Sequence, residues 1–326
     1  MTHRRTILAL LANLLPALYF AGAGAQPSRT AHRIGVLAQD LQPGLLDTFR
    51  DELQKLGYVE GDNIEIEVRN AAGRNDRLAG LANELLRLNV VAIVAVNTPA
   101  AQAAKKATSA IPIIMMRVAD PVKSGLVASF ARPGGNVTGL SFMPDALGPK
   151  GVEMLREIVP NLSRMAALYQ GDNTGAVVIV DEVERKGRQM GLTFLRVPVR
   201  DAKEYAAAFD SMVKIQAQAL FVMDDGAITK RRQLILDLAA HHALPVVSIY
   251  KDFAEAGGLI AYGPDLDTVY RRGAYYVDRL IKGEAASQLP IEQPTNFHLA
   301  VNLRTARALG LTIPPTLLAR ADEVIE

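Results

Sequence analysis

The chain alternates short apolar runs, rich in Val and Ile, with longer amphipathic stretches, and this alternation begins at residue 33. Such a pattern is typical of parallel β-strands that are connected by helices. Residues 33–38 form the first apolar run. The stretch after it places Leu45, Leu53 and Leu56 on one helical face. Gly57 can then end the helix in a left-handed conformation, so we predict an α/β fold.

The alternation occurs as two consecutive sets. The first set has predicted strands at 33–38, 64–68, 90–96, 111–116 and 137–140, with helices at 45–56, 76–88 and around 101–104. The second set has predicted strands at 165–169, 192–197, 219–223 and 246–249, with helices at 149–158, 176–190, 205–212 and 229–240. Two sets of this kind predict two doubly wound parallel-sheet lobes that are joined by a hinge and separated by a crevice.

The last part of the chain, from Gly258 onward, is too short for a third lobe. We expect it to pass back and forth between the two lobes and to cover both. We accordingly assign residues 32–141 and 262–290 to an N-terminal lobe, and residues 142–261 and 291–326 to a C-terminal lobe.

The N-terminus has the features of an export signal. Arg4 and Arg5 precede an apolar run over 7–20, and a small-x-small pattern ends at Ala25. We predict a signal peptide over residues 1–25 that is cleaved after Ala25. The two arginines fit both an ordinary secretory signal and a twin-arginine signal. Because the sequence has no cysteine to carry a lipid anchor, we expect a free periplasmic protein.

Composition excludes several classes of function. With 49% apolar and 21% charged residues, the chain is an ordinary globular protein. It has 36 basic and 34 acidic residues, and two of the basic ones belong to the leader, so the mature part has no net charge and no sign of a nucleic-acid surface. The absence of cysteine excludes disulfides, thiolate metal sites and thiol catalysis.

Candidate ligand residues follow the predicted strands. In open parallel sheets the carboxyl ends of the strands face a crevice, and helix N-termini there offer free N–H groups. The positions just after the strands are Gln39, Asp40, Asn97, Thr98, 118–120, Gln170, Asp172, Asp224, Asp225 and Tyr250.

These positions suggest how a zwitterion could bind. Thr98 can cap a helix whose first residue is Pro99, which would leave N–H groups free for a carboxylate. On the opposite lobe, Asp172 and Asp225 could hold an ammonium group, and Tyr250 could offer an apolar surface. Each residue also has a purely structural explanation, as a helix cap, a solvated charge or a packed ring. We predict an amino acid or a similar small carboxylate-bearing ligand.

The sequence contains no catalytic motif that we can identify. It has no phosphate loop, no Gly-x-Ser-x-Gly elbow and no His-Glu-x-x-His helix. His241 and His242 are adjacent and would point in different directions on a helix. We expect no catalytic residue, no metal site and no cofactor. An enzyme that uses Asp172, Asp224 or Asp225 as an acid or base remains an alternative.

Several strings resemble the extracellular binding proteins of ABC uptake systems, some of which bind tryptophan or related amino acids. The resemblance extends over the mature chain. The strings are LGYVEG at 56–61, DPVKSGLV at 120–127, RPGGNVTG at 132–139, LREIVP at 155–160, Asn302 and the segment 306–314.

The resemblance implies a type I periplasmic binding protein fold with three crossings between the lobes. It implies a small-molecule ligand, a monomer, and permease and ATPase partners in the inner membrane. A periplasmic sensor that signals to a membrane partner is the main alternative. Amino-acid binders of the family usually carry a Pro-Ser or Pro-Asn string after the first strand of the second lobe. At that place this chain has the different string Gln-Gly-Asp-Asn, at residues 170–173. The pocket residues implied are Gln39, Asn97, Thr98, Asp120, Asp172, Asp225 and Tyr250.

Overall fold

The first sheet is entirely parallel and has the strand order β2-β1-β3-β4-β5. The computed structural model describes residues 31–326, so the predicted signal peptide lies outside the described residues. The strands of this sheet are β1 (His32–Ala38), β2 (Ile64–Asn70), β3 (Ala92–Val96), β4 (Ile113–Val118) and β5 (Val137–Ser141). The strand order changes direction between β1 and β3, and polar residues follow both strands.

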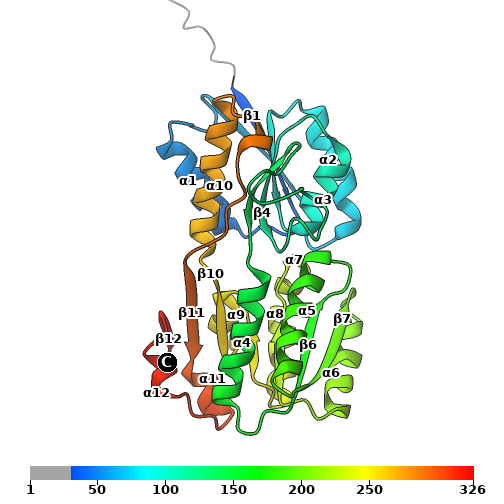
Figure 1. Cartoon of the computed structure of the whole chain (residues 1–326), viewed down its shortest axis with the longest axis vertical. Coiled ribbons are helices and arrows are strands. Elements are labelled where there is room, and N and C mark those ends of the chain that lie inside the picture. The colour runs from blue at the N-terminus through cyan, green and yellow to red at the C-terminus, as the bar shows by residue number, and fades with distance from the viewer. Residues whose placement is uncertain (1–30) are drawn as a thin grey trace, which may run out of the picture. The chain divides into compact units, whose positions relative to one another are not determined.

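Helices cover both faces of this sheet (Figure 1). On one face α10 packs against α1 and lies over β3, β4 and β5, and on the other face α2 and α3 pack together. Alternate side chains of each buried strand pack against the helices on opposite faces, because successive side chains of a strand point in opposite directions. We call this sheet with its helices the first lobe. Its helices are α1 (Pro43–Lys55), the short η1 (Asn75–Arg77), α2 (Leu78–Arg87), α3 (Thr98–Ala107) and α10 (Leu266–Ile281).

The second sheet has the order β12-β11-β10-β9-β8-β6-β7. Its strands pair in parallel except for β10 and β11, which pair antiparallel. The strands are β6 (Arg164–Gln170), β7 (Thr193–Val199), β8 (Ala219–Val222), β9 (Val246–Ser248), β10 (Ile260–Pro264), β11 (Phe297–Asn302) and β12 (Glu323–Ile325).

The second sheet and its helices form what we call the second lobe. Helices α4 and α5 pack against each other on one face, and α6 and α8 cover the other face. The helices are α4 (Pro144–Ile158), α5 (Thr174–Gln189), α6 (Glu204–Lys214), α7 (Gly226–Thr229), α8 (Arg232–His241), α9 (Lys251–Glu255), α11 (Leu303–Ala308) and α12 (Pro315–Leu318).

The C-terminal part of the chain visits both sheets. After β10, the chain enters α10 on the first lobe. The segment around Glu292 then runs beside β5, where its N–H donates to the carbonyl of Gly139 at 3.0 Å. The chain returns to the second sheet as β11 and pairs with β10. Together with the passage from β5 to α4, the chain passes between the sheets three times, and the short η2 (Ala286–Gln288) lies on this path.

The observed elements differ from the expected ones in a few places. The helix expected from residue 149 begins at Pro144, and Pro149 lies inside it. The helix expected over 229–240 begins only at Arg232. The residues before it form the separate four-residue helix α7, which Asp225 caps. Leu56, expected on the buried face, follows the end of α1 and is exposed. No helix within residues 31–326 is long and apolar enough to cross a membrane.

Candidate ligand-binding site

Polar side chains from both lobes are buried together at the carboxyl ends of the strands. The first lobe contributes residues that follow β1 and β3 and one residue within β4, and the second lobe contributes residues that follow β6, β8 and β9. Parallel strands end at the same edge of a sheet, which is why residues distant in sequence meet there. The buried polar and aromatic residues of this cluster are Gln39, Asn97, Thr98, Arg117, Asn173, Asp224, Asp225 and Tyr250.

Asp225 is held by four hydrogen-bond donors. Its Oδ1 accepts from the backbone N–H groups of Ala227 and Ile228, at 3.0 and 3.2 Å, and thereby caps α7. Its Oδ2 accepts from Nδ2 of Asn173 at 2.8 Å and from Nε2 of Gln39 at 3.4 Å. Burial raises the pKa of Asp225, and these four donors oppose the rise. Two carboxylate oxygens offer about four acceptor positions, so this carboxylate has none left for a ligand ammonium in the described state.

The bond between Gln39 and Asp225 crosses from the first lobe to the second. Gln39 also accepts from Nδ2 of Asn97, at 3.2 Å. Asn97 is the residue before α3 and has a φ of 77° and a ψ of 158°, a backbone conformation that residues other than glycine rarely adopt. Gln39, Asn97 and Asp225 therefore form one buried chain of hydrogen bonds, and the structure brings these three predicted residues together.

The prediction that Thr98 caps a helix is wrong. Asn97 is the N-cap residue and Thr98 is the first residue of α3. The Thr98 hydroxyl accepts from the N–H of Ala119 at 3.4 Å. It also faces Gly175 of the second lobe so closely that a Cβ at Gly175 would lie 2.2 Å from Oγ1. Thr98 is thus buried at the contact between the lobes.

Arg117 is a buried cation that the sequence reasoning missed. It is 6% exposed, and its guanidinium carbon lies 4.4 Å from the centre of the Tyr250 ring. Its Nε donates to the Tyr250 hydroxyl at 3.3 Å. Burial opposes the charge, but the neighbouring oxygens of Tyr250, Tyr270 and Asp224 raise the pKa of Arg117. Its place at the end of a strand was the signal that could have identified it.

Asp224 differs from its neighbour Asp225 in its contacts. Its Oδ1 accepts from the hydroxyl of Thr229 at 2.6 Å, whereas its Oδ2 is buried and has no hydrogen-bond partner within the described residues. Burial raises the pKa of Asp224 to about 7, against the opposing effects of the Thr229 bond and of Arg117. This carboxyl therefore has an acceptor position available inside the cluster.

Asp120 and Asp172 lie outside the buried cluster. Asp120 accepts from the backbone N–H groups of Val122 and Lys123, at 3.0 and 2.9 Å, so it shapes the turn after β4. Asp172 is exposed and accepts from Nε2 of Gln170 at 2.8 Å. The structure therefore brings together five of the seven predicted residues and leaves these two carboxylates at the edge.

The lobes are in contact across the crevice, which makes this a closed state. The space inside the cluster has a volume of about 10 Å³, which is roughly room for one water molecule. Two ion pairs join the lobes further out, between Lys230 and Asp40 at 3.5 Å and between Lys123 and Glu182 at 3.6 Å. A ligand can therefore enter only when the lobes separate or the buried side chains withdraw.

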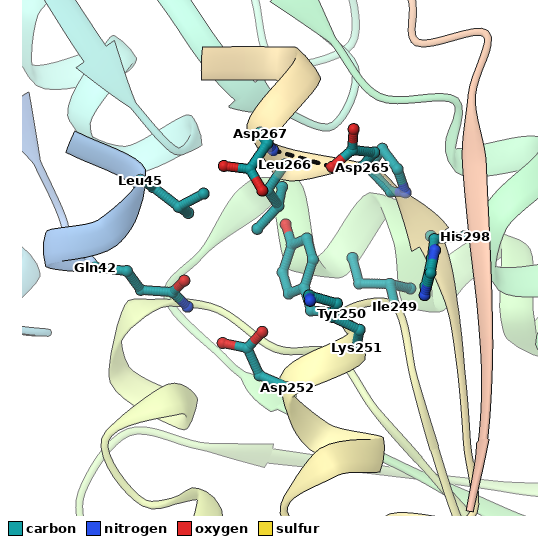
Figure 2. A pocket seen from close by; sticks show the side chains of 12 residues that line it. Gln42, Leu45, Ile249, Tyr250, Lys251, Asp252, Asp265, Leu266, Asp267 and His298 are labelled. Atoms are coloured by element: carbon teal, nitrogen blue, oxygen red, sulfur yellow. Dashed lines mark hydrogen bonds between the residues drawn. The ribbon is translucent and has the colours of Figure 1, made fainter. Parts of the chain in front are cut away.

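A larger cavity of about 310 Å³ lies on the other side of Tyr250, and Figure 2 shows it from close by. Gln42 and Leu45 of the first lobe line it, together with Asp252 and His298 of the second lobe. Tyr250 lines both this cavity and the buried cluster. The two spaces are therefore adjacent at this residue. Across the described part of the chain, no three His, Asp or Glu side chains are arranged to hold a metal ion.

Comparisons with known proteins agree with this architecture. The tyrosine-binding protein of Clostridioides difficile (strain R20291) is 27% identical over 265 residues, which cover 81% of this chain and 75% of the relative. A crystal structure of an ABC domain in complex with L-Trp from Streptococcus pneumonia is 27% identical, covers 91% of this chain and 100% of its own, and has a TM-score of 0.85. The fold is that of the type I periplasmic binding proteins.

The described state resembles the L-Trp complex more than an open structure. A ligand-free, open structure of a substrate binding protein with adhesive properties from Clostridium difficile is 25% identical and covers 90% of this chain and 99% of its own, yet its TM-score is 0.65. The direct contacts between the lobes agree with this comparison.

The family model for ABC transporter substrate binding proteins matches residues 38–325. Proteins of this family act outside the cytoplasm, bind small-molecule ligands and work with permease and ATPase subunits in the membrane; they are binding proteins rather than enzymes. Because the match extends over nearly all of the described residues and the fold agrees with it, the chain belongs to the family of ABC transporter substrate binding proteins.

Proposed function

We propose that this protein captures an amino acid, or a similar small carboxylate-bearing molecule, in the crevice between its lobes and delivers it to an importer. The observation that carries the proposal is that side chains of both charges are buried there, Arg117 from the first lobe and Asp224 and Asp225 from the second. A neutral sugar would leave Arg117 and Asp224 without a ligand group of opposite charge, at a cost of several kcal/mol. The Tyr-binding relative and the L-Trp complex support an amino acid.

Of the residues predicted from sequence, we propose for the ligand site the five that lie in the buried cluster, namely Gln39, Asn97, Thr98, Asp225 and Tyr250. Asp120 and Asp172 would reach a ligand only in a different arrangement of the lobes. For the lobes themselves we propose residues 32–141 with 262–290 and residues 142–261 with 291–326. The packing of α10 on the first sheet and the pairing of β11 with β10 support this division. Residues 262–264, however, pair within the second sheet, and residues 291–292 bond to the first lobe.

The experiment that tests the proposed function is a thermal-shift screen of the mature protein. Amino acids and other small carboxylates form one arm, and neutral sugars of similar size form the other. A ligand that binds only the folded state stabilises it by about 2.7 kcal/mol at a concentration one hundred times its Kd. We expect an increase in melting temperature with an amino acid or a carboxylate. Increases with the sugars alone would contradict the proposal.

We propose that the protein is a periplasmic monomer without catalytic activity. The predicted leader at 1–25 supports export, and mature protein from the periplasm should begin at Gln26, as N-terminal sequencing can check. An uncleaved chain in the membrane fraction would contradict this. A sensor would use the same closure, and an assay of ligand-dependent interaction with an ABC permease distinguishes delivery from sensing.

A further inference from the structure

We infer that Arg117 and Asp224 form a charge clamp, in which Arg117 binds the carboxylate of a zwitterionic ligand and Asp224 binds its ammonium group. The inference rests on the proposed function and names the two groups that recognise the ligand. It also replaces the prediction from sequence, which placed the carboxylate at the start of α3 and the ammonium group at Asp172 and Asp225. Four observations on the described residues lead to the clamp.

First, Arg117 is a buried cation that takes part in no ion pair with another described residue. Its Nε donates to the hydroxyl of Tyr250 at 3.3 Å, and the hydroxyl of Tyr270 is a second polar neighbour. Its terminal nitrogens could donate four more hydrogen bonds. A buried charge is stable only when it is paired and hydrogen-bonded, and a guanidinium fits a carboxylate in a bidentate manner. A ligand carboxylate would supply the missing partner.

Second, the backbone holds Arg117 in an unusual conformation. Its φ is 58°, in the left-handed region that only Gly adopts freely. The pairing of β4 with β5 also shifts register between Met115 and Val118. Strained residues of this kind persist where the surrounding structure requires them, and they cluster at ligand sites. Here the irregularity brings the guanidinium of a first-lobe residue onto Tyr250 of the second lobe.

Third, Asp224 has a buried acceptor oxygen without a donor. Its Oδ2 lies within the cluster and has no partner among the described residues, although the residue is 1% exposed. Asp224 and Arg117 come from opposite lobes, and both line the same small space. They form no ion pair with each other in the described state. A ligand ammonium would donate to the free oxygen, and a ligand carboxylate would accept from the guanidinium.

Fourth, the carboxylate that could compete with Asp224 is already occupied. Asp225 accepts from four donors. The remaining surface beside the clamp is aromatic, with the Phe142 and Tyr250 ring centres 6.2 Å apart. The site thus combines two charges of opposite sign with an apolar wall. This combination fits an α-amino acid better than a carboxylate without an amine.

The test compares ligands that lack one charged group. Binding of the twenty common L-amino acids to the mature protein is measured by calorimetry. The tightest one is then compared with its decarboxylated amine and with its deaminated acid. We expect each of these two analogues to bind about 10- to 100-fold more weakly than the amino acid, because one charge-assisted hydrogen-bonded contact is lost.

Two variants then assign the groups. In Asp224→Asn, the amino acid should lose its advantage over the deaminated acid but keep its advantage over the amine. In Arg117→Gln, the reverse should hold, and Arg117→Lys should retain part of the advantage because it keeps the charge but not the planar fork. Asp225→Asn is the matched control. It removes the neighbouring carboxylate, so it should weaken all three ligands alike.

The outcomes separate the clamp from the proposed function. If unchanged selectivity is measured in both folded variants, the clamp is wrong, even if an amino acid binds. Tight binding of a carboxylate without an amine, sensitive to Arg117 but not to Asp224, also overturns the clamp and leaves the proposed function intact. If neither amino acids nor carboxylates bind, both are overturned. Circular dichroism establishes that each variant is folded, and the selectivity ratio within one variant does not depend on its stability.

Discussion

At the scale of single residues, Asp224 and Asp225 show how two adjacent carboxylates acquire different properties. Both are buried, at 1% and 2% exposure. Asp225 points at the start of α7 and has four donors, whereas Asp224 has the Thr229 hydroxyl and one free oxygen. The sequence places both at a strand end, but it does not say which one is satisfied. The difference affects stability as well as binding.

The free carboxylate of Asp224 makes the ligand-free protein less stable as the pH rises. Burial raises its pKa from 3.8 to about 7, so between these pH values the folded protein holds a proton that the unfolded chain has released. Folding stability must therefore fall as the pH rises through this range, by about 1.4 kcal/mol for each unit by which the pKa is raised. The charged groups that act on Asp224 are Arg117, Asp225 and Asp252.

We predict that Asp224→Asn reduces this dependence. The variant should match the wild type near pH 4 and be more stable near pH 7, as measured by urea unfolding across the range. Asp225, whose pKa burial also raises, remains in the variant and should leave a smaller slope of the same sign. If the free energy of unfolding changed equally with pH in the two proteins, Asp224 would have to be ionised in the folded state over the whole pH range.

At the scale of elements, two helices of the second lobe begin where the first lobe comes closest. Helix α5 has Gly175 near its start, facing Thr98, and α7 begins with Gly226, facing Asp40. A Cβ at Gly226 would lie 2.4 Å from Cβ of Asp40 and 2.8 Å from its backbone nitrogen. Because Asp40 belongs to the first lobe and Gly226 to the second, such a clash would be relieved only if the lobes opened. Glycine is therefore needed here for closure rather than for a turn.

We predict that Gly226→Ala folds normally but closes poorly. The open state has no clash, so the melting temperature of the ligand-free protein should change little. Ligand affinity should fall by about tenfold or more, which corresponds to about 1.4 kcal/mol or more. The matched control is Gly80→Ala in α2, where an added Cβ meets nothing within 4 Å. An affinity equal to that of the wild type would mean that the lobes close in another arrangement.

At the scale of the whole molecule, the ion pairs between the lobes contribute little to closure. The ion pairs of Lys230 with Asp40 and of Lys123 with Glu182 have lysines that are 42% and 58% exposed. Exposed pairs of this kind contribute about 0–1 kcal/mol each. The buried Arg117 and the free oxygen of Asp224 oppose closure unless a ligand binds them. The ligand therefore favours the closed state through its contacts with both lobes.

We predict that the mature protein becomes more compact when it binds its ligand. Small-angle scattering should show a smaller radius of gyration at saturating ligand, because the free protein samples open arrangements. Gly226→Ala should show less compaction than Gly80→Ala at the same saturation. Identical scattering with and without a bound ligand would contradict hinge closure.

The sequence by itself determined the α/β class, the two sets of strands and helices, and the strand ends at which a ligand site could lie. These features depend on hydrophobic periodicity, which is set within segments of about ten to fifteen residues. It also determined that Gln39, Asn97, Asp225 and Tyr250 lie near a crevice, because each follows a strand whose limits the pattern defines.

The tertiary structure alone decided which of these side chains meet. Gln39 reaches Asp225, and Arg117 reaches Tyr250, only because two separate sheets face each other with particular strand orders. The sequence shows that Arg117 lies near the end of β4, but it does not show that this residue adopts a φ of 58° and contacts Tyr250 of the other lobe. Asp120 and Asp172 follow strands as well, yet local hydrogen bonds hold them at the edge. Contacts between residues more than fifty positions apart depend on packing, which local periodicity does not encode.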